Sequence, residues 1–125
     1  MSVPSSPEGS VLRAARSARH VSLEALAPPG RLLIVAPHPD DETLGCGMAL
    51  AAALATGRQV AILLLTDGES SHPNSRKFGT ARRVATRLAE FESALTALAP
   101  GKPIPVVRAH LPDGQTTDRN AAQII

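Results

Sequence analysis

Short, uninterrupted aliphatic runs alternate along the chain with longer segments in which apolar and polar residues are mixed. Three such runs lie at residues 31–36, 59–66 and 104–109. Continuous aliphatic runs of this length are typical of parallel strands that are buried on both faces. A polar stretch follows each run, so we expect the loops at the carboxyl ends of these strands to gather at one edge of a sheet.

Two segments between these runs repeat apolar residues every three or four positions, which predicts helices with one buried face. They cover residues 43–55 and 81–98, and a further helix is expected from about residue 117. Strands that alternate with helices predict an α/β fold with a parallel sheet. The residues that mark the two helical faces are Leu44, Met48, Ala51 and Leu54 in the first helix, and Val84, Leu88, Phe91, Leu95 and Leu98 in the second.

The amino-terminal 30 residues form an extension of different character. Residues 1–9 are rich in Ser and Pro and are expected to be disordered, and residues 10–27 are expected to form a short helix. Pro28, Pro29 and Gly30 then end this segment. We therefore divide the chain into an extension, 1–30, and a single domain, 31–125.

Composition narrows the class of protein. Hydrophobic residues make up 43% of the chain, only two residues are aromatic, and the net charge of +2 is too small to favour a nucleic-acid partner. No segment has the roughly 18 consecutive apolar residues expected of a membrane span. Cys46 is the only cysteine, which excludes an internal disulfide and favours a reducing, cytoplasmic setting. We expect Cys46 to be a small buried residue of the first helix.

The six residues after the first strand, PHPDDE at positions 37–42, carry the most specific chemistry. A hydrolytic zinc site needs about three His, Asp, Glu or Cys ligands, and a base beside them. His38 can supply a nitrogen ligand, and one of Asp40 and Asp41 can bind the metal while the other acts as base. The alternative is that the two aspartates only cap the following helix. The residue pattern alone leaves open which aspartate has which role.

Asp67 and Glu69 follow the second strand and are expected at the same edge of the sheet. They either accept hydrogen bonds that orient His38 or simply form a turn with Gly68. The basic residues of the next segment are expected to be a solvated helix face, with attraction of a phosphorylated or nucleotide-linked sugar as the alternative. These residues are Arg76, Lys77, Arg82, Arg83 and Arg87.

Four blocks in this order resemble the LmbE-like, or PIG-L-type, family of metal-dependent N-acetylglucosamine deacetylases. The resemblance runs from about residue 31 to residue 118, and the first block, PHPDDETLGCG at 37–47, is the most specific. The weaker blocks are LTDGE at 65–69, the pair Arg87-x-x-Glu90, and LPDG at 111–114.

The resemblance implies a Rossmann-like, three-layer fold with a parallel sheet and a bound zinc ion. It implies that His38 and Asp41 are metal ligands and that Asp40 is the general base. Arg87 and Asp113 would lie near the hydroxyl groups of an N-acetylated amino sugar, from which the enzyme would remove the acetyl group.

The sequence departs from the family pattern in its last part. Family members carry a later His-x-x-His motif that supplies the third metal ligand, and residues 115–125 contain no histidine. His72 and His110 are the remaining candidates for that ligand. We therefore expect a domain truncated at its carboxyl end, with weak metal binding, little or no turnover and self-association through an incomplete sheet edge. The alternatives are a catalytically inactive Rossmann-like fragment and a nucleotide-sugar-binding module.

Overall fold

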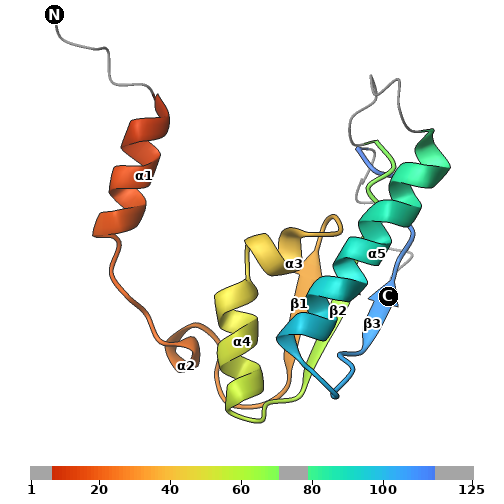
Figure 1. Ribbon diagram of the computed structural model, residues 1–125. Helices are drawn as coiled ribbons and strands as arrows, with labels where there is room; N and C mark the ends of the chain where they lie inside the picture. The colour runs from red at the N-terminus through yellow and green to blue at the C-terminus, as the bar shows by residue number, and fades with distance from the viewer. Residues whose placement is uncertain (1–6, 71–78, 115–125) are drawn as a thin grey trace, which may run out of the picture.

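The computed structural model describes residues 7–70 and 79–114 of the 125-residue chain. Its sheet has three parallel strands in the order β1-β2-β3, so each strand lies beside its neighbour in sequence (Figure 1). The strands are β1 (Leu32–Ala36), β2 (Val60–Leu64) and β3 (Val106–Arg108). Ile34 pairs in register with Ile62, and Ile62 with Val106. The predicted parallel α/β fold is confirmed.

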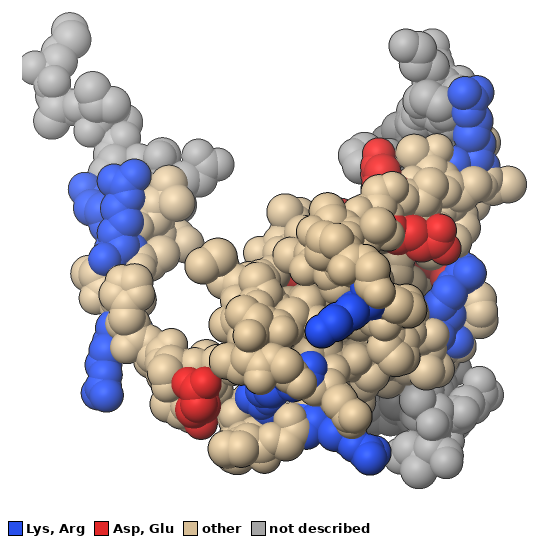
Figure 2. Space-filling model, turned by 60° about the horizontal axis from the view of Figure 1, so that its bottom comes forward, with Lys and Arg blue, Asp and Glu red and all other residues tan. Residues whose placement is uncertain are grey.

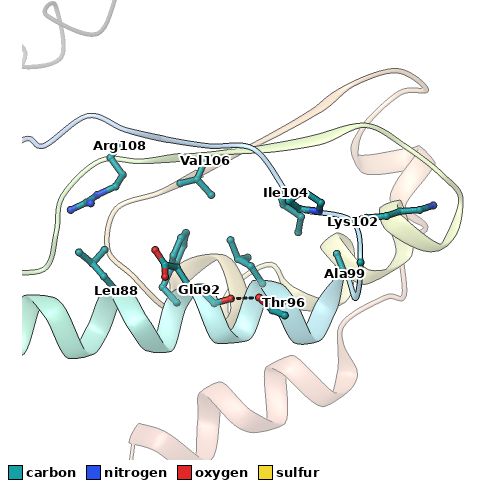
Figure 3. A pocket seen from close by; sticks show the side chains of 12 residues that line it. Leu88, Glu92, Thr96, Ala99, Lys102, Ile104, Val106 and Arg108 are labelled. Atoms are coloured by element: carbon teal, nitrogen blue, oxygen red, sulfur yellow. Dashed lines mark hydrogen bonds between the residues drawn. The ribbon is translucent and has the colours of Figure 1, made fainter.

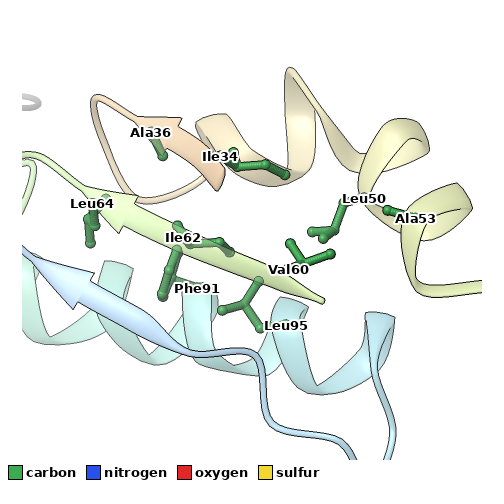
Figure 4. Close-up of a cluster of buried hydrophobic side chains, with 9 residues drawn as sticks. All are labelled: Ile34, Ala36, Leu50, Ala53, Val60, Ile62, Leu64, Phe91 and Leu95. Carbon is green, nitrogen blue, oxygen red and sulfur yellow. The ribbon is translucent and has the colours of Figure 1, made fainter. Parts of the chain in front are cut away.

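Two helices connect these strands and pack on one face of the sheet. They are α4 (Gly47–Ala55) and α5 (Thr80–Leu98). Every second residue of β1 and β2 points toward them, and these side chains form one core with apolar residues of both helices (Figure 4). The buried members of this core are Ile34, Ala36, Leu50, Ala53, Val60, Ile62, Leu64, Phe91 and Leu95.

The opposite face of the sheet is open in the described part of the chain. Leu33, Val35 and Val107 are 59%, 51% and 62% exposed. The expectation of strands buried on both faces is therefore wrong for these residues, and the described segments form two layers of the expected three. Both connections run along the same face of the sheet.

The first predicted helix is broken in two. Residues Asp41–Leu44 form a single turn, α3, and α4 begins only at Gly47. The break changes which side chains face the core, because Leu44 and Met48 are 82% and 88% exposed while Leu50 and Ala53 are buried. Cys46 lies at the break and is exposed, which corrects the expectation that it is buried.

Helix α5 agrees closely with its prediction. It spans Thr80–Leu98 and buries Phe91 and Leu95, with Leu88 and Leu98 packed against the same core. The third strand is shorter than predicted, partly because Pro105 precedes it and has no amide hydrogen to donate. The helix expected from residue 117 lies outside the described residues.

The extension contains two helices where one was expected, α1 (Pro7–Ser17) and α2 (Leu23–Leu26). Helix α1 already begins at Pro7, within the stretch expected to be disordered, and it stands apart from the sheet (Figure 1). The segment after α2 is tied to the domain by Arg58, whose guanidinium donates to three backbone carbonyl groups. The acceptors are Gly30 O at 3.0 Å, Ala27 O at 3.1 Å and Pro28 O at 2.8 Å. None of the described helices combines the length and apolar character needed to cross a membrane.

Candidate active site

The loop after β1 is held in place by the segment after β2. The hydroxyl and the amide of Thr66 both donate to Pro37 O, at 2.8 and 3.1 Å, and Thr66 itself is buried. The loop therefore lies at the carboxyl edge of the sheet, where parallel α/β proteins bind ligands. A hollow beside it is lined by residues of all three post-strand segments: Pro37, His38, Leu65, Thr66, Asp113 and Gly114.

His38 and Asp41 converge within this loop. The ring nitrogen Nδ1 of His38 lies 3.2 Å from Asp41 Oδ2, and the His38 amide donates to the same oxygen at 2.9 Å. Two ligands of a tetrahedral zinc ion, each bound at about 2.0–2.1 Å, lie about 3.3 Å apart. The types and spacing of these two atoms therefore fit a shared zinc ion.

A third ligand is missing from the part of the chain that is described. No group of three or more His, Cys, Asp or Glu side chains that could hold a metal occurs among residues 7–70 and 79–114. His110 instead places Nδ1 3.0 Å from Asp67 Oδ2, and His72 lies outside the described residues. This region thus brings together two side chains of the right type, where a zinc hydrolase uses roughly three protein ligands.

Asp40 has an unusual backbone for a residue other than glycine, with φ of 117°. Such conformations persist only where neighbouring groups hold them. The Asp40 amide donates to Glu42 Oε2 at 3.1 Å, and the carboxylate accepts from Arg87 Nη2 at 3.1 Å. Asp40 precedes α3 but makes no capping hydrogen bond with its side chain. The geometry therefore disfavours the interpretation of Asp40 as only a helix cap.

Glu42 is a part of the site that sequence reasoning did not assign. Its side chain is fully buried, and Oε1 accepts from the Thr43 hydroxyl at 2.7 Å while Oε2 accepts from the Asp40 amide. A buried carboxylate needs such donors. One feature of the sequence could have indicated this role. Glu42 is the third acidic residue in a row, and a helix cap needs only one.

Arg87 reaches from α5 into this loop. Its Nη2 donates to Pro39 O at 2.8 Å as well as to Asp40 Oδ2, and its Nη1 donates to Gly68 O at 3.4 Å. The guanidinium therefore joins the loops that follow β1 and β2. Its expected contact with a sugar hydroxyl stays a prediction.

Asp113 belongs to the loop after β3, and its side chain contacts His38 across the hollow. Asp113 Oδ1 lies 2.9 Å from His38 Nε2. Glu69 and Asp67, for which orienting His38 was one of two interpretations, make no hydrogen bond to its ring in the described structure. Glu69 Oε1 accepts from the Asp113 amide at 2.8 Å, whereas Asp67 contacts Arg108 and His110.

Asp67 and Arg108 link the ends of β2 and β3. Asp67 Oδ1 lies 2.8 Å from Arg108 Nη2 and 3.1 Å from Arg108 Nε. Burial raises the pKa of the Asp67 carboxyl, but the hydrogen bonds and charges of Arg108 and His110 outweigh burial, so the pKa lies below its ordinary value. Asp67 is therefore a structural anion at neutral pH.

Basic side chains form no continuous patch on the face drawn in Figure 2, where uncharged surface separates them. Of the predicted basic cluster, Arg76 and Lys77 lie outside the described residues. Arg83 Nη2 contacts Thr80 Oγ1 at 3.2 Å.

A second hollow, of about 560 Å³, lies between the carboxyl half of α5 and the segment that leads into β3 (Figure 3). It is lined by apolar residues such as Leu88 and Ile104 together with Lys102 and Arg108. Neither His38 nor an aspartate of the β1 loop lines it. His38 and Asp113 line the smaller hollow at the edge of the sheet, whereas Asp40 and Arg87 line a separate hollow beside the same loop.

Residues 33–125 match the family described as PIG-L: GlcNAc-PI de-N-acetylase. Relatives from Corynebacterium jeikeium and Rhodococcus opacus, both named 1D-myo-inositol 2-acetamido-2-deoxy-alpha-D-glucopyranoside deacetylase, are 37% and 38% identical over 54% and 58% of this chain. The matches cover 23% and 27% of those relatives, so the chain aligns with about a quarter of their length.

Solved structures share the fold. An N,N'-diacetylchitobiose deacetylase from Pyrococcus horikoshii superimposes on 95% of this chain with a TM-score of 0.69 and 19% identity, and the match covers 44% of that protein. A conserved protein from Thermus thermophilus matches 70% of the chain with a TM-score of 0.52 and 38% identity. GalB, a 4-carboxy-2-hydroxymuconate hydratase, also matches, with a TM-score of 0.60 and 20% identity.

Proposed function

The chain belongs to the PIG-L family of GlcNAc-PI de-N-acetylases, and we propose that it carries the catalytic loop of a zinc-dependent hydrolase. The proposed reaction removes the acetyl group from an N-acetylglucosamine-type amino sugar or its conjugate. The observation that carries this proposal is the convergence of His38 Nδ1 and Asp41 Oδ2, 3.2 Å apart, in the loop that also contains Asp40.

Each residue of the loop has a distinct part in the proposal. His38 and Asp41 would hold a zinc ion, which would supply Lewis-acid polarisation of the acetyl carbonyl. Asp40 accepts a proton from the water that attacks this carbonyl. As the C–N bond breaks, that proton passes to the amine nitrogen, and acetate and the free amine leave. Arg87 fixes the Asp40 carboxylate through their 3.1 Å ion pair, and in this proposal it also donates to a sugar hydroxyl.

The relatives favour this substrate class over other reactions of the same fold. Those from Corynebacterium and Rhodococcus are named as deacetylases of a 2-acetamido-2-deoxyglucose conjugate. The likeness to GalB, a hydratase, is a likeness of fold alone at 20% identity, and fold does not fix chemistry. The acidic loop and the named relatives together support deacetylation.

Substitution of the proposed base tests this function. With zinc, the chain should release free amine from 1D-myo-inositol 2-acetamido-2-deoxy-alpha-D-glucopyranoside or N,N'-diacetylchitobiose, slowly because the described residues offer two of the roughly three ligands that a zinc hydrolase uses. Asp40→Asn should lower the rate by about 100-fold or more. Glu92→Gln, an exposed carboxylate of α5, is the control and should leave it unchanged. No release by the zinc-saturated chain, or equal release by Asp40→Asn, would contradict the proposal.

A further inference from the structure

His38 lies between two carboxylates, and this arrangement limits where its proton can be. Nε2 is 2.9 Å from Asp113 Oδ1, and Nδ1 is 3.2 Å from Asp41 Oδ2. A neutral imidazole has one N–H group, so it can donate to only one of these oxygens. The other nitrogen then presents a lone pair to a negatively charged oxygen.

The two carboxylates are not equivalent acceptors. The Asp113 side chain is 8% exposed, whereas that of Asp41 is 43% exposed. A hydrogen bond is stronger where water is excluded, and the Asp113 contact is also the shorter. Asp41 Oδ2 already accepts from the His38 amide at 2.9 Å. The proton is therefore favoured on Nε2, facing Asp113.

Hydrogen bonds to Ser70 and Glu69 hold Asp113 where it can accept a hydrogen bond from His38 Nε2. Its Oδ2 accepts from the Ser70 amide at 2.9 Å, its carbonyl accepts from the Ser70 hydroxyl at 3.0 Å, and its amide donates to Glu69 Oε1 at 2.8 Å. With the His38 proton on Nε2, both carboxylate oxygens have a donor. The Asp113 side chain is 8% exposed, so little of it is accessible to a sugar hydroxyl, which was its expected partner.

We infer that Asp113 is a positioning residue that keeps the proton of His38 on Nε2 and so directs the Nδ1 lone pair toward Asp41 Oδ2. Two acceptors 3.2 Å apart repel each other unless a cation lies between them. The arrangement thus prepares the pair for a metal ion, because a carboxylate partner fixes the tautomer of a ligating histidine. The metal part of this inference rests on the proposed function; the tautomer part rests on His38 and Asp113 alone.

The tautomer can be measured in the metal-free chain by ¹⁵N NMR of the histidine rings at about pH 8, where an ordinary imidazole is neutral. In the unsubstituted protein, His38 should show Nε2–H and an unprotonated Nδ1. Asp113→Asn, which offers a weaker neutral acceptor, should move the population toward Nδ1–H. Asp67→Asn is the matched control, since Asp67 does not contact His38, and should leave this tautomer unchanged.

Metal affinity gives the second readout. Asp113→Asn should weaken zinc binding by about 10–100-fold, with Asp67→Asn close to the unsubstituted chain. A His38 that carries its proton on Nδ1 or on both nitrogens in the unsubstituted protein would overturn the inference. So would a raised KM in Asp113→Asn with tautomer and zinc affinity unchanged, which would assign Asp113 to the sugar. Absence of amine release with the Nε2–H tautomer present would count against the proposed reaction and not against the role of Asp113.

Discussion

The Arg87 side chain occupies the space that a side chain at position 68 would need, where α5 approaches the loop after β2. Gly68 is buried with φ of +69°, and a Cβ atom there would collide with the Arg87 guanidinium and contact the ring of Pro39. The same guanidinium holds Pro39 O and the Asp40 carboxylate. A side chain at position 68 would therefore disturb the loop that carries the proposed base.

Gly68→Ala should lower the free energy of unfolding by about 1–2 kcal/mol, since it adds backbone strain and displaces the half-buried Arg87 guanidinium from its hydrogen bonds to Pro39 O and Asp40 Oδ2. Chemical denaturation measures this loss. Gly57→Ala is the control, because Gly57 has φ of +73° and a Cβ atom added there would have no heavy atom within 4 Å. Equal losses in the two variants would show that the collision with Arg87 carries no cost.

Sequence reasoning at this scale identified the loop but not all of its contacts. The acidic run and the two prolines predicted where His38 and Asp41 would lie, because the spacing is local. The partner of His38 Nε2 is 75 residues away, and no local pattern specifies such a contact. Asp67 and Asp113 lie on neighbouring loops of the same edge, and only the three-dimensional path of these loops selects Asp113.

Among the elements, β2 and β3 are joined at their carboxyl ends by the Asp67–Arg108 ion pair described above. The lowered pKa of Asp67 means that the unfolded chain binds this proton more readily than the folded chain. The stabilisation is therefore complete above the unfolded pKa of about 3.9. It is lost as the pH falls through the lower pKa of the folded protein.

Asp67→Asn should reduce the free energy of unfolding by about 0.5–1 kcal/mol at neutral pH, in the range of a partly exposed ion pair. The difference between variant and unsubstituted protein should shrink toward zero as the solution is acidified below pH of about 4. Thermal unfolding followed across this pH range checks both points. Glu92→Gln should show neither effect, and a difference that stays constant with pH would contradict the assignment.

The apolar pattern predicted the buried face of α5 correctly but not that of α4. Helix α5 has a single clear apolar stripe, so its bounds and its buried face were both predictable. The segment 43–55 is apolar nearly all round, which removes the contrast that identifies a face. Gly45 lies between α3 and α4, where the backbone passes so close to Asp41 O that an added Cβ atom would lie 2.8 Å from it. A local backbone contact, rather than helical spacing, decided the outcome.

At the scale of the molecule, the open apolar face of the sheet is the main departure from prediction. The aliphatic runs indicate strands made for burial on both sides, yet Leu33, Val35 and Val107 face outward in the described structure. The outer edges of β1 and β3 also have no strand beside them among the described residues. Such edges and faces favour association between copies.

The chain should therefore self-associate reversibly, and Val35→Lys should weaken this association by placing a charge on the open face. Sedimentation velocity over a dilution series measures it. Leu12→Lys is the control, because Leu12 is an equally exposed apolar residue on α1, away from the sheet. A chain that remains monomeric at all concentrations, or equal effects of the two substitutions, would contradict this prediction.

The contact between His38 and Asp113 also has a consequence for how the protein is made. The motif consists of six consecutive residues, 37–42. The site also includes the side chain of Asp113, which is synthesised much later. A nascent chain that ends before Asp113, or a synthetic peptide of residues 37–42, would contain the motif without the contact that orients the His38 ring. The contact between His38 and Asp113 forms only when both strand pairings have closed, so the proposed catalytic competence is acquired together with folding.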